Sequence, residues 1–439
     1  MSTLVPIIQF EPTTQDHRTE AVAFIARHMT RDSQDDPEVR RVAEDVVEDV
    51  RKNGDAALLS YTKKFDQADL TAADMKVTDT EIKEALAAVP ADLKRTLKRA
   101  AERVRVYHQR QLQNSWFDTS NEGEILGQLV RPVDAAGVYV PGGTAPLAST
   151  VLMNIVPAQV AGVERIIVAT PPDKNGKVYP AIIAAAVESG ATEIYKMGGA
   201  QAIAALAFGT ATVPQVDKIV GPGNIYVTMA KRAVFGYVGI DSIAGPSEIA
   251  IVADDTANPA FVAADMLSQA EHDERASSIL VTTSQTLAEA VQEQLVEQSK
   301  QLPRKDIIDI SLKNNGLIIL TDNIKDAFHI ANAIGAEHLE VCTTDPFEKL
   351  TLVRHAGAVF LGNYTSEPLG DYMAGPNHVL PTYGTARFFS PLSVDDFVKK
   401  TSVLSFSQEA MEKLREDVVL FARAEQLDAH ANAVDMRKL

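Results

Sequence analysis

The feature that most constrains the fold is an alternation, from residue 137 onward, of short β-rich runs with alanine-rich stretches of helical character. Each stretch between two runs is long enough for a helical crossover, which is typical of a parallel sheet. The runs form two series and therefore predict two open, Rossmann-like α/β units, a loose architectural repeat without a fixed sequence period. The first series is GVYVPGG (137–143), RIIVAT (165–170), EIYKMGG (193–199) and DKIVGPGN (217–224), and the second is IAIVAD (249–254), SILVTT (278–283), GLIILT (316–321), EHLEV (337–341) and GAVFLG (357–362).

Helical sequence flanks the two series. Residues 36–116 are charged and helical in pattern, and the segment Thr78-Asp-Thr-Glu81 is a capping box at the start of one helix. After Pro391 the pattern predicts helices at 395–400 and 408–425 and a short tail to residue 439. A chain of 439 residues is expected to divide into about three domains at roughly 150 residues each. We expect an N-terminal extension (1–28), a first α/β domain with the metal and catalytic residues (29–132 with 245–385), a second α/β domain that binds the cofactor (133–244) and a small helical C-terminal appendage (386–439).

Charge and cysteine content narrow the function classes. The formal net charge is −17, and the chain lacks the clustered Lys and Arg on which nucleic-acid binding depends. Cys342 is the single cysteine, so an intrachain disulfide is excluded. No apolar run approaches the ~20 residues that span a bilayer, and the N-terminus has neither a basic nor a long apolar region. We therefore expect a cytoplasmic enzyme that binds neither nucleic acid nor membranes.

Three glycine-rich turns follow predicted strands of the first series, at 140–150, 197–207 and 221–231. Backbone amides at the start of the next helix can face an anion there. For any single turn, the steric need for glycine between strand and helix is the simpler explanation. Three such turns in one sheet favour a ligand-binding edge, although none matches G-x-G-x-x-G or the G-x-x-x-x-G-K-[ST] phosphate loop.

Polar clusters containing histidine predict a metal-dependent site. Gln269 and His272 are three residues apart, so on a helix their side chains point to the same side, as two ligands of one ion must. A lone Q-x-x-H is more often a hydrogen-bonded helix end than a metal site, and His430 alone could be a surface residue near the terminus. Together with Asp371, these groups would suit Zn²⁺, although Gln is an unusual ligand for it.

Two further clusters carry groups able to move protons. Glu337 and His338 lie at the predicted start of a strand, where they are either two bases near a cation or an exposed pair at a strand edge. Residues 370–378 place Asp371 and His378 in what the glycines and proline predict to be an irregular loop. A turn explains the glycines and proline of this segment but not its acid and imidazole.

Six motifs, in order and with their spacing, make the chain closely resemble histidinol dehydrogenases. The resemblance extends from about residue 36 to residue 431, and the combination is far more specific than any single motif. The motifs are GGAQAIAALAFGT (198–210), VGPGNIYVTMAKR (220–232), AGPSEI (244–249), SQAEHD (268–273), AEHLEV (336–341) and GDYMAGPNHVLPT (370–382). This family implies an aldehyde-dehydrogenase-like pair of α/β units and a zinc-dependent, four-electron oxidation of L-histidinol through histidinaldehyde to L-histidine, the last step of histidine biosynthesis, with two NAD used in succession.

The resemblance also implies roles for individual residues. His338 would accept the alcohol proton, and Glu337 would activate the water that attacks the aldehyde. The C-terminal tail would complete the partner subunit's site, which implies an obligate homodimer. The zinc ligands would be Gln269, His272, Asp371 and His430; further substrate contacts would be Ser247, His338, His378 and Glu425; and the NAD contacts would be Tyr139, Gln201 and Asn224.

Alternatives to this chemistry remain open from the residues alone. Aldehyde oxidation in many enzymes uses a cysteine, but Cys342 lies in LEVCTT, where a small buried apolar role is the better interpretation, so Cys342→Ser is expected to keep most activity. Asp273 and Glu274 beside the proposed metal either tune it or solvate the helix end. A zinc hydrolase would use metal-bound water without NAD, and a non-catalytic binding protein would keep the fold without turnover.

Overall fold

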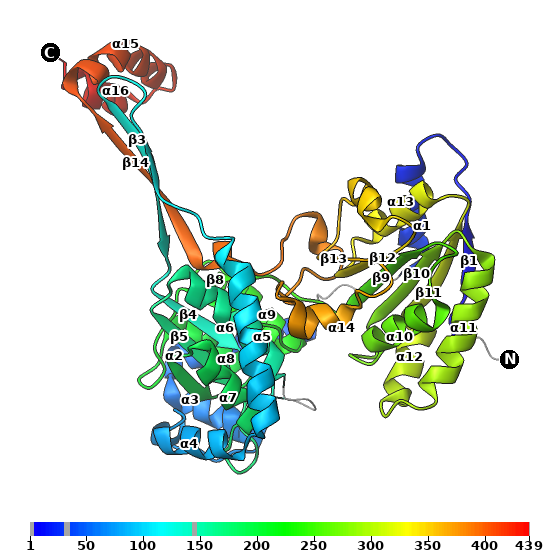
Figure 1. Cartoon of the computed structure of the whole chain (residues 1–439). Helices are drawn as coiled ribbons and strands as arrows, with labels where there is room; N and C mark the ends of the chain where they lie inside the picture. Colours follow the sequence, from blue (N-terminus) through cyan, green and yellow to red (C-terminus); the bar gives the residue numbers. More distant parts are fainter. Residues whose placement is uncertain (1–3, 30–35, 143–146, 439) are drawn as a thin grey trace.

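The computed structural model describes residues 4–29, 36–142 and 147–438, and in them the two predicted α/β units are confirmed (Figure 1). Every predicted run of both series contains a strand, and all the strand pairs within the two larger sheets are parallel. When β1, which is added at one edge of the first sheet, is left out, the strands of both units, numbered in chain order, lie in the same order 3-2-1-4-5, so the architectural repeat is confirmed. None of the helices in the described part of the chain combines the length and apolar character needed to cross a bilayer.

The first unit is built on a six-stranded sheet of order β1-β11-β10-β9-β12-β13. Its apolar strands are buried on both faces, as parallel strands covered by helices must be. One face is covered by α10 (Pro259–Ala270), α11 (Gln285–Ser299) and α12 (Lys305–Asn315), and the other by α1 (His17–His28) and α13 (Ile324–Ile334). The strands are β1 (Ile7–Phe10), β9 (Glu248–Ala253), β10 (Ser277–Thr282), β11 (Gly316–Thr321), β12 (His338–Cys342) and β13 (Ala358–Leu361).

The second unit is built on a five-stranded sheet of order β6-β5-β4-β7-β8. One face packs against α4 (Asp79–Ala88), α5 (Ala91–Gln109), α6 (Ala148–Ala161) and α7 (Pro180–Ser189). The opposite face packs against α2 (Pro37–Asn53), α3 (Asp55–Tyr61), α8 (Gly199–Phe208) and α9 (Ile225–Val234). The strands are β4 (Ala135–Tyr139), β5 (Arg165–Thr170), β6 (Glu193–Lys196), β7 (Lys218–Val220) and β8 (Gly239–Ile240).

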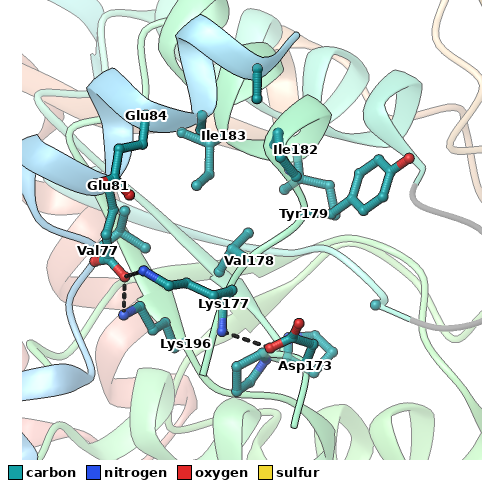
Figure 2. A pocket seen from close by; sticks show the side chains of 16 residues that line it. Val77, Glu81, Glu84, Asp173, Lys177, Val178, Tyr179, Ile182, Ile183 and Lys196 are labelled. Atoms are coloured by element: carbon teal, nitrogen blue, oxygen red, sulfur yellow. Dashed lines mark hydrogen bonds and ion pairs between the residues drawn. The ribbon is translucent and has the colours of Figure 1, made fainter. Parts of the chain in front are cut away.

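The N-terminal helices require a correction to the predicted domain boundaries. Residues 29–132 were expected in the first domain, but α2 to α5 pack on the sheet of residues 133–244. The capping box at Thr78 is confirmed, and its Glu81 also forms an ion pair with Lys196 at the end of β6, at 2.6 Å (Figure 2). Conversely, residues 7–28 are no separate extension, since β1 pairs with β11 and α1 packs against α13.

A long arm projects from the second unit, away from the first (Figure 1). Its stem is the antiparallel pair of β3 (Glu124–Pro132) and β14 (Val398–Phe406), with β2 (Trp116–Asp118) beside β3. Its tip is the helix pair α15 (Gln408–Ala424) and α16 (Asp428–Asp435). The helical appendage is therefore confirmed at its tip, but the predicted helix at 395–400 is wrong, because a short 3-10 turn at Val394–Phe397 leads directly into β14.

Candidate functional site

Most of the predicted polar residues meet at the amino edge of the first sheet, the side at which its parallel strands begin. His338 is the first residue of β12, as predicted, and Glu248 begins its neighbour β9. Helices α10 and α13 both end at this edge, at Ala270 and Ile334. The carboxyl end of a helix carries partial negative charge, so the edge favours a bound cation.

The backbone of β9 fixes the pair Glu337 and His338. The Nδ1 atom of His338 lies 3.2 Å from the Glu248 carbonyl oxygen, a contact that requires a proton on Nδ1. In the neutral imidazole this leaves Nε2 as the lone-pair nitrogen, and among the described residues Nε2 has no hydrogen-bond partner. The Glu248 amide donates to Oε2 of Glu337 at 3.1 Å. Both side chains are thus buried and oriented, and the alternative of an exposed strand-edge pair is excluded.

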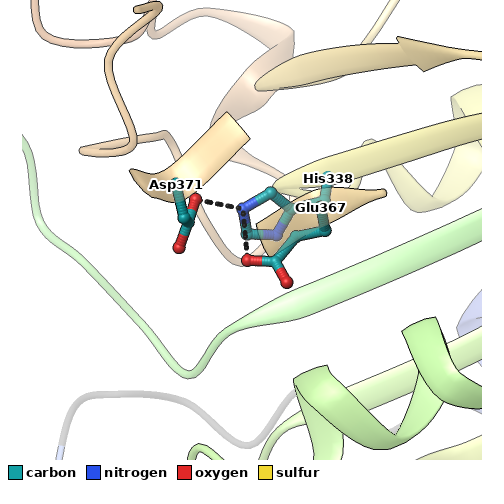
Figure 3. Close-up of side chains that lie close together, drawn as sticks. All are labelled: His338, Glu367 and Asp371. Atoms are coloured by element: carbon teal, nitrogen blue, oxygen red, sulfur yellow. Dashed lines mark ion pairs between the residues drawn. The ribbon is translucent and has the colours of Figure 1, made fainter. Parts of the chain in front are cut away.

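Two carboxylates face the free nitrogen of His338 (Figure 3). Nε2 lies 3.8 Å from Oδ1 of Asp371 and 3.9 Å from Oε1 of Glu367. One donor atom from each of His338, Glu367 and Asp371 lies within 4.8 Å of the others, a grouping able to hold a metal ion. Glu367 begins the short helix α14 (Glu367–Leu369), which continues into a π-helical turn at Gly370–Ala374, so Asp371 is helical rather than part of an irregular loop.

The acids and the imidazole perturb one another strongly. Burial raises the pKa of Glu337 to about 7 against the opposing charge of His338. Burial would lower the pKa of His338, but the carboxylates of Glu337 and Asp371 outweigh it and raise that pKa to about 9. Burial would likewise raise the pKa of Asp371, yet His338 and His378 hold it at about 2. Clusters of such shifted groups are common at active sites.

Gln269 lies in the last turn of α10 and His272 just beyond its end, next to the cluster of His338, Glu367 and Asp371. The amide of Gln269 is fully buried, and neither its oxygen nor its nitrogen has a partner within the described ranges. The preceding residue, Ser268, donates to Oε2 of Glu367 at 3.2 Å. Desolvation lowers the pKa of His272, and the nearby Asp371 carboxylate opposes the shift. An uncompensated buried amide is costly unless a ligand satisfies it.

The predicted substrate residues Ser247 and His378 flank the same cluster. Ser247 and His272 line one cavity of about 340 Å³. Nδ1 of His378 is 3.1 Å from the Asp371 carbonyl oxygen, and its Nε2 is 3.5 Å from Oγ1 of Thr150 on α6. His378 therefore lies between the two units, with one nitrogen turned to each. Asp273 and Glu274 are exposed, and Asp273 pairs with Arg275 of its own turn at 3.3 Å.

Tyr139, Gln201 and Asn224 line one cavity of about 510 Å³ at the carboxyl edge of the second sheet. Tyr139 ends β4 and Asn224 follows β7, which are neighbouring strands at the point where the strand order reverses. Ligands of open α/β sheets bind at such a switch point. Gly221 allows the close approach of these strand ends, because a Cβ there would lie 2.1 Å from the Tyr139 carbonyl oxygen. Residues 143–146 of the first glycine-rich turn lie outside the described residues.

The amide of Gln201 provides a second unsatisfied polar group. It is buried, and both of its polar atoms lack partners in the part of the chain that the structure describes. Gly199, two residues earlier, donates its amide to the Tyr139 hydroxyl at 3.1 Å. Asn224 lines this cavity and also the one that contains Ser247 and His272. The two cavities therefore both adjoin Asn224, and this residue is common to both.

The remaining predicted residues, Glu425 and His430, lie at the tip of the arm. Both are exposed, and the arm points away from the first unit (Figure 1). A single chain therefore brings Gln269, His272 and Asp371 to one edge but leaves His430 remote from them.

Some residues of the site have no counterpart among the predictions. Glu367, Glu340 and Asp265 form a buried acidic group behind His338, where the Glu367 amide donates to Oε1 of Glu340 at 2.9 Å. Glu367 had a usable signal, since it precedes Asp371 by four residues and so shares its face of a helix. Cys342 is buried at the opposite end of β12 from His338, and burial raises the pKa of its thiol, which favours the predicted passive role.

Comparison with known proteins agrees with the resemblance seen in the motifs. The sequence profile of the family described as histidinol dehydrogenase matches residues 29–438. The chain is 55% identical over 400 residues to the histidinol dehydrogenase of Bacillus licheniformis, covering 91% of this chain and 93% of that one. It is 52% identical over 423 residues to the enzyme of Clostridium acetobutylicum, covering 96% and 98%. The crystal structure of histidinol dehydrogenase from Elizabethkingia anophelis superposes with a TM-score of 0.92 at 38% identity, covering 100% of this chain and 98% of that one.

Proposed function

The chain belongs to the histidinol dehydrogenase family, and on that premise we propose that it oxidises L-histidinol to L-histidine in two NAD-dependent steps at a zinc site shared between two subunits. The observation that carries the proposal is the orientation of His338, whose Nε2 has no hydrogen-bond partner among the described residues and faces Asp371 and Glu367, while Glu337 is held beside it. In the first step the alcohol loses a proton and a hydride to give histidinaldehyde. In the second step water adds to the aldehyde, and the hydrate loses a hydride to a second NAD and two protons to give the carboxylate.

The residues at the amino edge fit a zinc ion. Gln269 offers a buried amide oxygen without a described partner, and His272 and Asp371 supply a nitrogen and a carboxylate near it. Such a mixed nitrogen and oxygen set suits Zn²⁺. We propose that Gln269, His272, Asp371 and the partner subunit's His430 hold the ion, which when bound would fix the imidazole and amino nitrogens of histidinol.

Two side chains of the protein, His338 and Glu337, each accept a proton in one of the two steps. In its neutral form, His338 accepts the proton of the alcohol at Nε2, because Nδ1 is held protonated by the Glu248 carbonyl. Its raised pKa of about 9 makes the neutral imidazole a strong base, and the first step is therefore expected to speed up as the pH rises toward 9. Glu337 accepts a proton from the attacking water, and its raised pKa near 7 makes it a stronger base than an ordinary carboxylate. Ser247, His378 and the partner's Glu425 contact the substrate.

NAD would occupy the cavity lined by Tyr139, Gln201 and Asn224 and supply the hydride acceptor, which side chains cannot provide. The nicotinamide end would lie near Asn224, because this residue also borders the cavity of Ser247 and His272. The unsatisfied amide of Gln201 is available for a polar group of the cofactor.

The arm supports a homodimer with shared sites. Its tip has only a small core of its own, formed by Val419, Ala422 and Ala431 with Val434. Large apolar side chains remain exposed on it, including Leu420, Phe421 and Met436 at 71%, 70% and 83% exposure. Exposed apolar surface of this kind marks an interface. We propose that the arm packs on a second copy and delivers Glu425 and His430 to that copy's site.

The substitution Glu337→Gln tests the two-step reaction. Glutamine can still accept from the Glu248 amide but cannot take a proton from water, so oxidation of histidinaldehyde is expected to slow by roughly a hundredfold or more. Oxidation of histidinol to the aldehyde is expected to stay within about threefold, because that step depends on His338. Rapid-mixing measurements of NADH absorbance, with each compound supplied in turn, separate the two steps.

Glu274→Gln is the control for this test, since it removes an exposed acid near the same edge and should change neither step. Equal losses in both steps for Glu337→Gln would contradict the assigned role of Glu337.

A further inference from the structure

An acid outside the predicted set faces the cofactor cavity. Asp66 ends the π-helical turn Thr62–Asp66 that follows α3, and it lines the same cavity as Tyr139 and Gln201. Its Oδ2 atom is buried and has no hydrogen-bond partner among residues 4–29, 36–142 and 147–438. Burial raises the pKa of this carboxyl to about 6, as expected for an acid without compensating donors.

Asp66 lies beside the end of the second strand of its unit. A Cβ placed on Gly198 would be 3.3 Å from Oδ1 of Asp66 and 2.6 Å from Cβ of Pro171, so both residues lie against the same glycine. Pro171 directly follows β5, which is second in the strand sequence of this sheet. Dinucleotide-binding folds place at this point an acid that accepts from a ribose hydroxyl. Strand β5 ends at Thr170 and is followed directly by Pro171 and Pro172, and Asp66 brings a carboxylate to this strand end from outside the sheet.

The two ends of the cavity indicate which ribose of a bound dinucleotide would lie near Asp66. Asn224 borders the substrate cavity and so marks the end where the nicotinamide must lie. Asp66, Gly142 and Pro171 line the same cavity. Gly142 and Pro171 also border a neighbouring cavity, which is lined by Asp173, Lys177 and Lys196. The carboxylate of Asp66 is therefore placed for the adenosine half of a dinucleotide.

Among the described residues that line the neighbouring cavity, none offers a buried carboxylate oxygen without a partner, and its Glu84 is exposed (Figure 2). Its lysines are already paired, since Glu81 Oε1 lies 2.6 Å from Nζ of Lys196 and 3.6 Å from Nζ of Lys177. Its Asp173 accepts from the Lys177 amide at 2.9 Å. The carboxylate of Asp66, by contrast, has an oxygen left for a ligand.

We propose that Asp66 accepts hydrogen bonds from the adenosine ribose hydroxyls of NAD and, by its charge, excludes the 2′-phosphate of NADP. This rests on the proposed function only in assuming that a nicotinamide dinucleotide occupies the cavity. Asp66 is thereby a specificity-determining residue for the cofactor.

The substitution Asp66→Asn in the full-length protein tests this assignment. We expect the Kd for NADH, measured by the change in its fluorescence, to rise about tenfold, because asparagine keeps one acceptor oxygen but loses the charge that strengthens the hydrogen bonds. The ratio of kcat/KM for NAD to that for NADP should fall at least as much, because the repulsion of the 2′-phosphate is removed. The kcat at saturating NAD should stay within about twofold, since Asp66 is remote from the transferred hydride.

Asp69→Asn is the matched control, because Asp69 is an exposed acid of the same segment, paired with Lys63 at 2.8 Å. It should leave the NADH affinity and the cofactor preference unchanged. If Asp66→Asn fails to fold, as judged by its melting transition, Asp66→Ser is measured in its place. Tight NADH binding by the wild type with an unchanged Kd and cofactor preference in the variant would overturn the role of Asp66 alone. Absence of NADH binding by the wild type would instead overturn the proposed function and this inference with it.

Discussion

Replacing His338 by asparagine is expected to lower kcat for histidinol oxidation by roughly a thousandfold, within the range that general-base catalysis contributes. The asparagine amide can still donate to the Glu248 carbonyl, as Nδ1 of His338 does at 3.2 Å, so the local fold should be kept. It has no counterpart to Nε2, the nitrogen that faces Asp371 and Glu367. Steady-state NADH absorbance measures the loss, and calorimetric titration with histidinol should show an affinity within a few fold of the wild type.

A second histidine variant controls for the loss of an imidazole. His355→Asn changes a ring that lies outside the cluster of His338, Glu367 and Asp371, and it should leave kcat within about twofold. A kcat for His338→Asn within tenfold of the wild type would contradict its role as the base for the alcohol.

Mixing two inactive variants is expected to restore activity. His430→Asn removes a proposed zinc ligand carried by the arm, and His338→Asn removes the proposed base in the first α/β unit. If the arm serves the partner, each mixed dimer contains one site with both defects and one intact site. Random pairing makes half of the dimers mixed, so about a quarter of the wild-type activity should return, against almost none for either variant alone. Co-expression with two affinity tags allows the mixed dimer to be isolated, and its activity should then be about half that of the wild type.

The physical basis of this prediction is the position of the arm. His430 is exposed at its tip, on α16, while Gln269 and Asp371 lie at the sheet edge of the other unit (Figure 1). An arm that folded back on its own chain would give mixed dimers in which both sites are defective. Zero activity in the isolated mixed dimer would therefore exclude the exchange of arms, and unchanged zinc content in His430→Asn after dialysis would remove His430 from the ligand set.

The central strands of both units could be predicted because they are buried on both faces and form continuous apolar runs in the sequence, as in β9 and β11. Strands β1 and β8, which are less buried, were not predicted. The alternation with crossover helices then predicts parallel sheets. Helix α4 could be located from its capping box, which depends on residues only three apart.

The assignment of helices to units could not be predicted in the same way. The apolar stripes of α2 and α5 indicate that each helix covers a sheet, but a stripe does not identify which of two sheets it covers. Strand β14 escaped prediction because its ladder partner β3 is more than 250 residues away in sequence, and most of its side chains are exposed. Non-local pairing of this kind leaves a weak local pattern.

The residues of the site could be predicted only in part, for the same reason. Gln269 and His272 are close in sequence, as are Glu337 and His338, so each pair could be identified from its spacing. The contact between His338 and Glu367 depends on how β12 and α14 fold together, and Asp66 reaches the cofactor cavity from a different part of the chain. Such contacts arise from tertiary packing, which no local pattern encodes.

The number of NADH molecules formed per histidinol consumed tests the central claim most directly. The count is made with zinc-loaded enzyme, with chelator-stripped enzyme and with stripped enzyme to which zinc is returned. The account predicts two NADH per histidinol, lost on stripping and restored by zinc. A folded, zinc-loaded enzyme that forms no NADH from histidinol, or that forms one and releases histidinaldehyde, would contradict it.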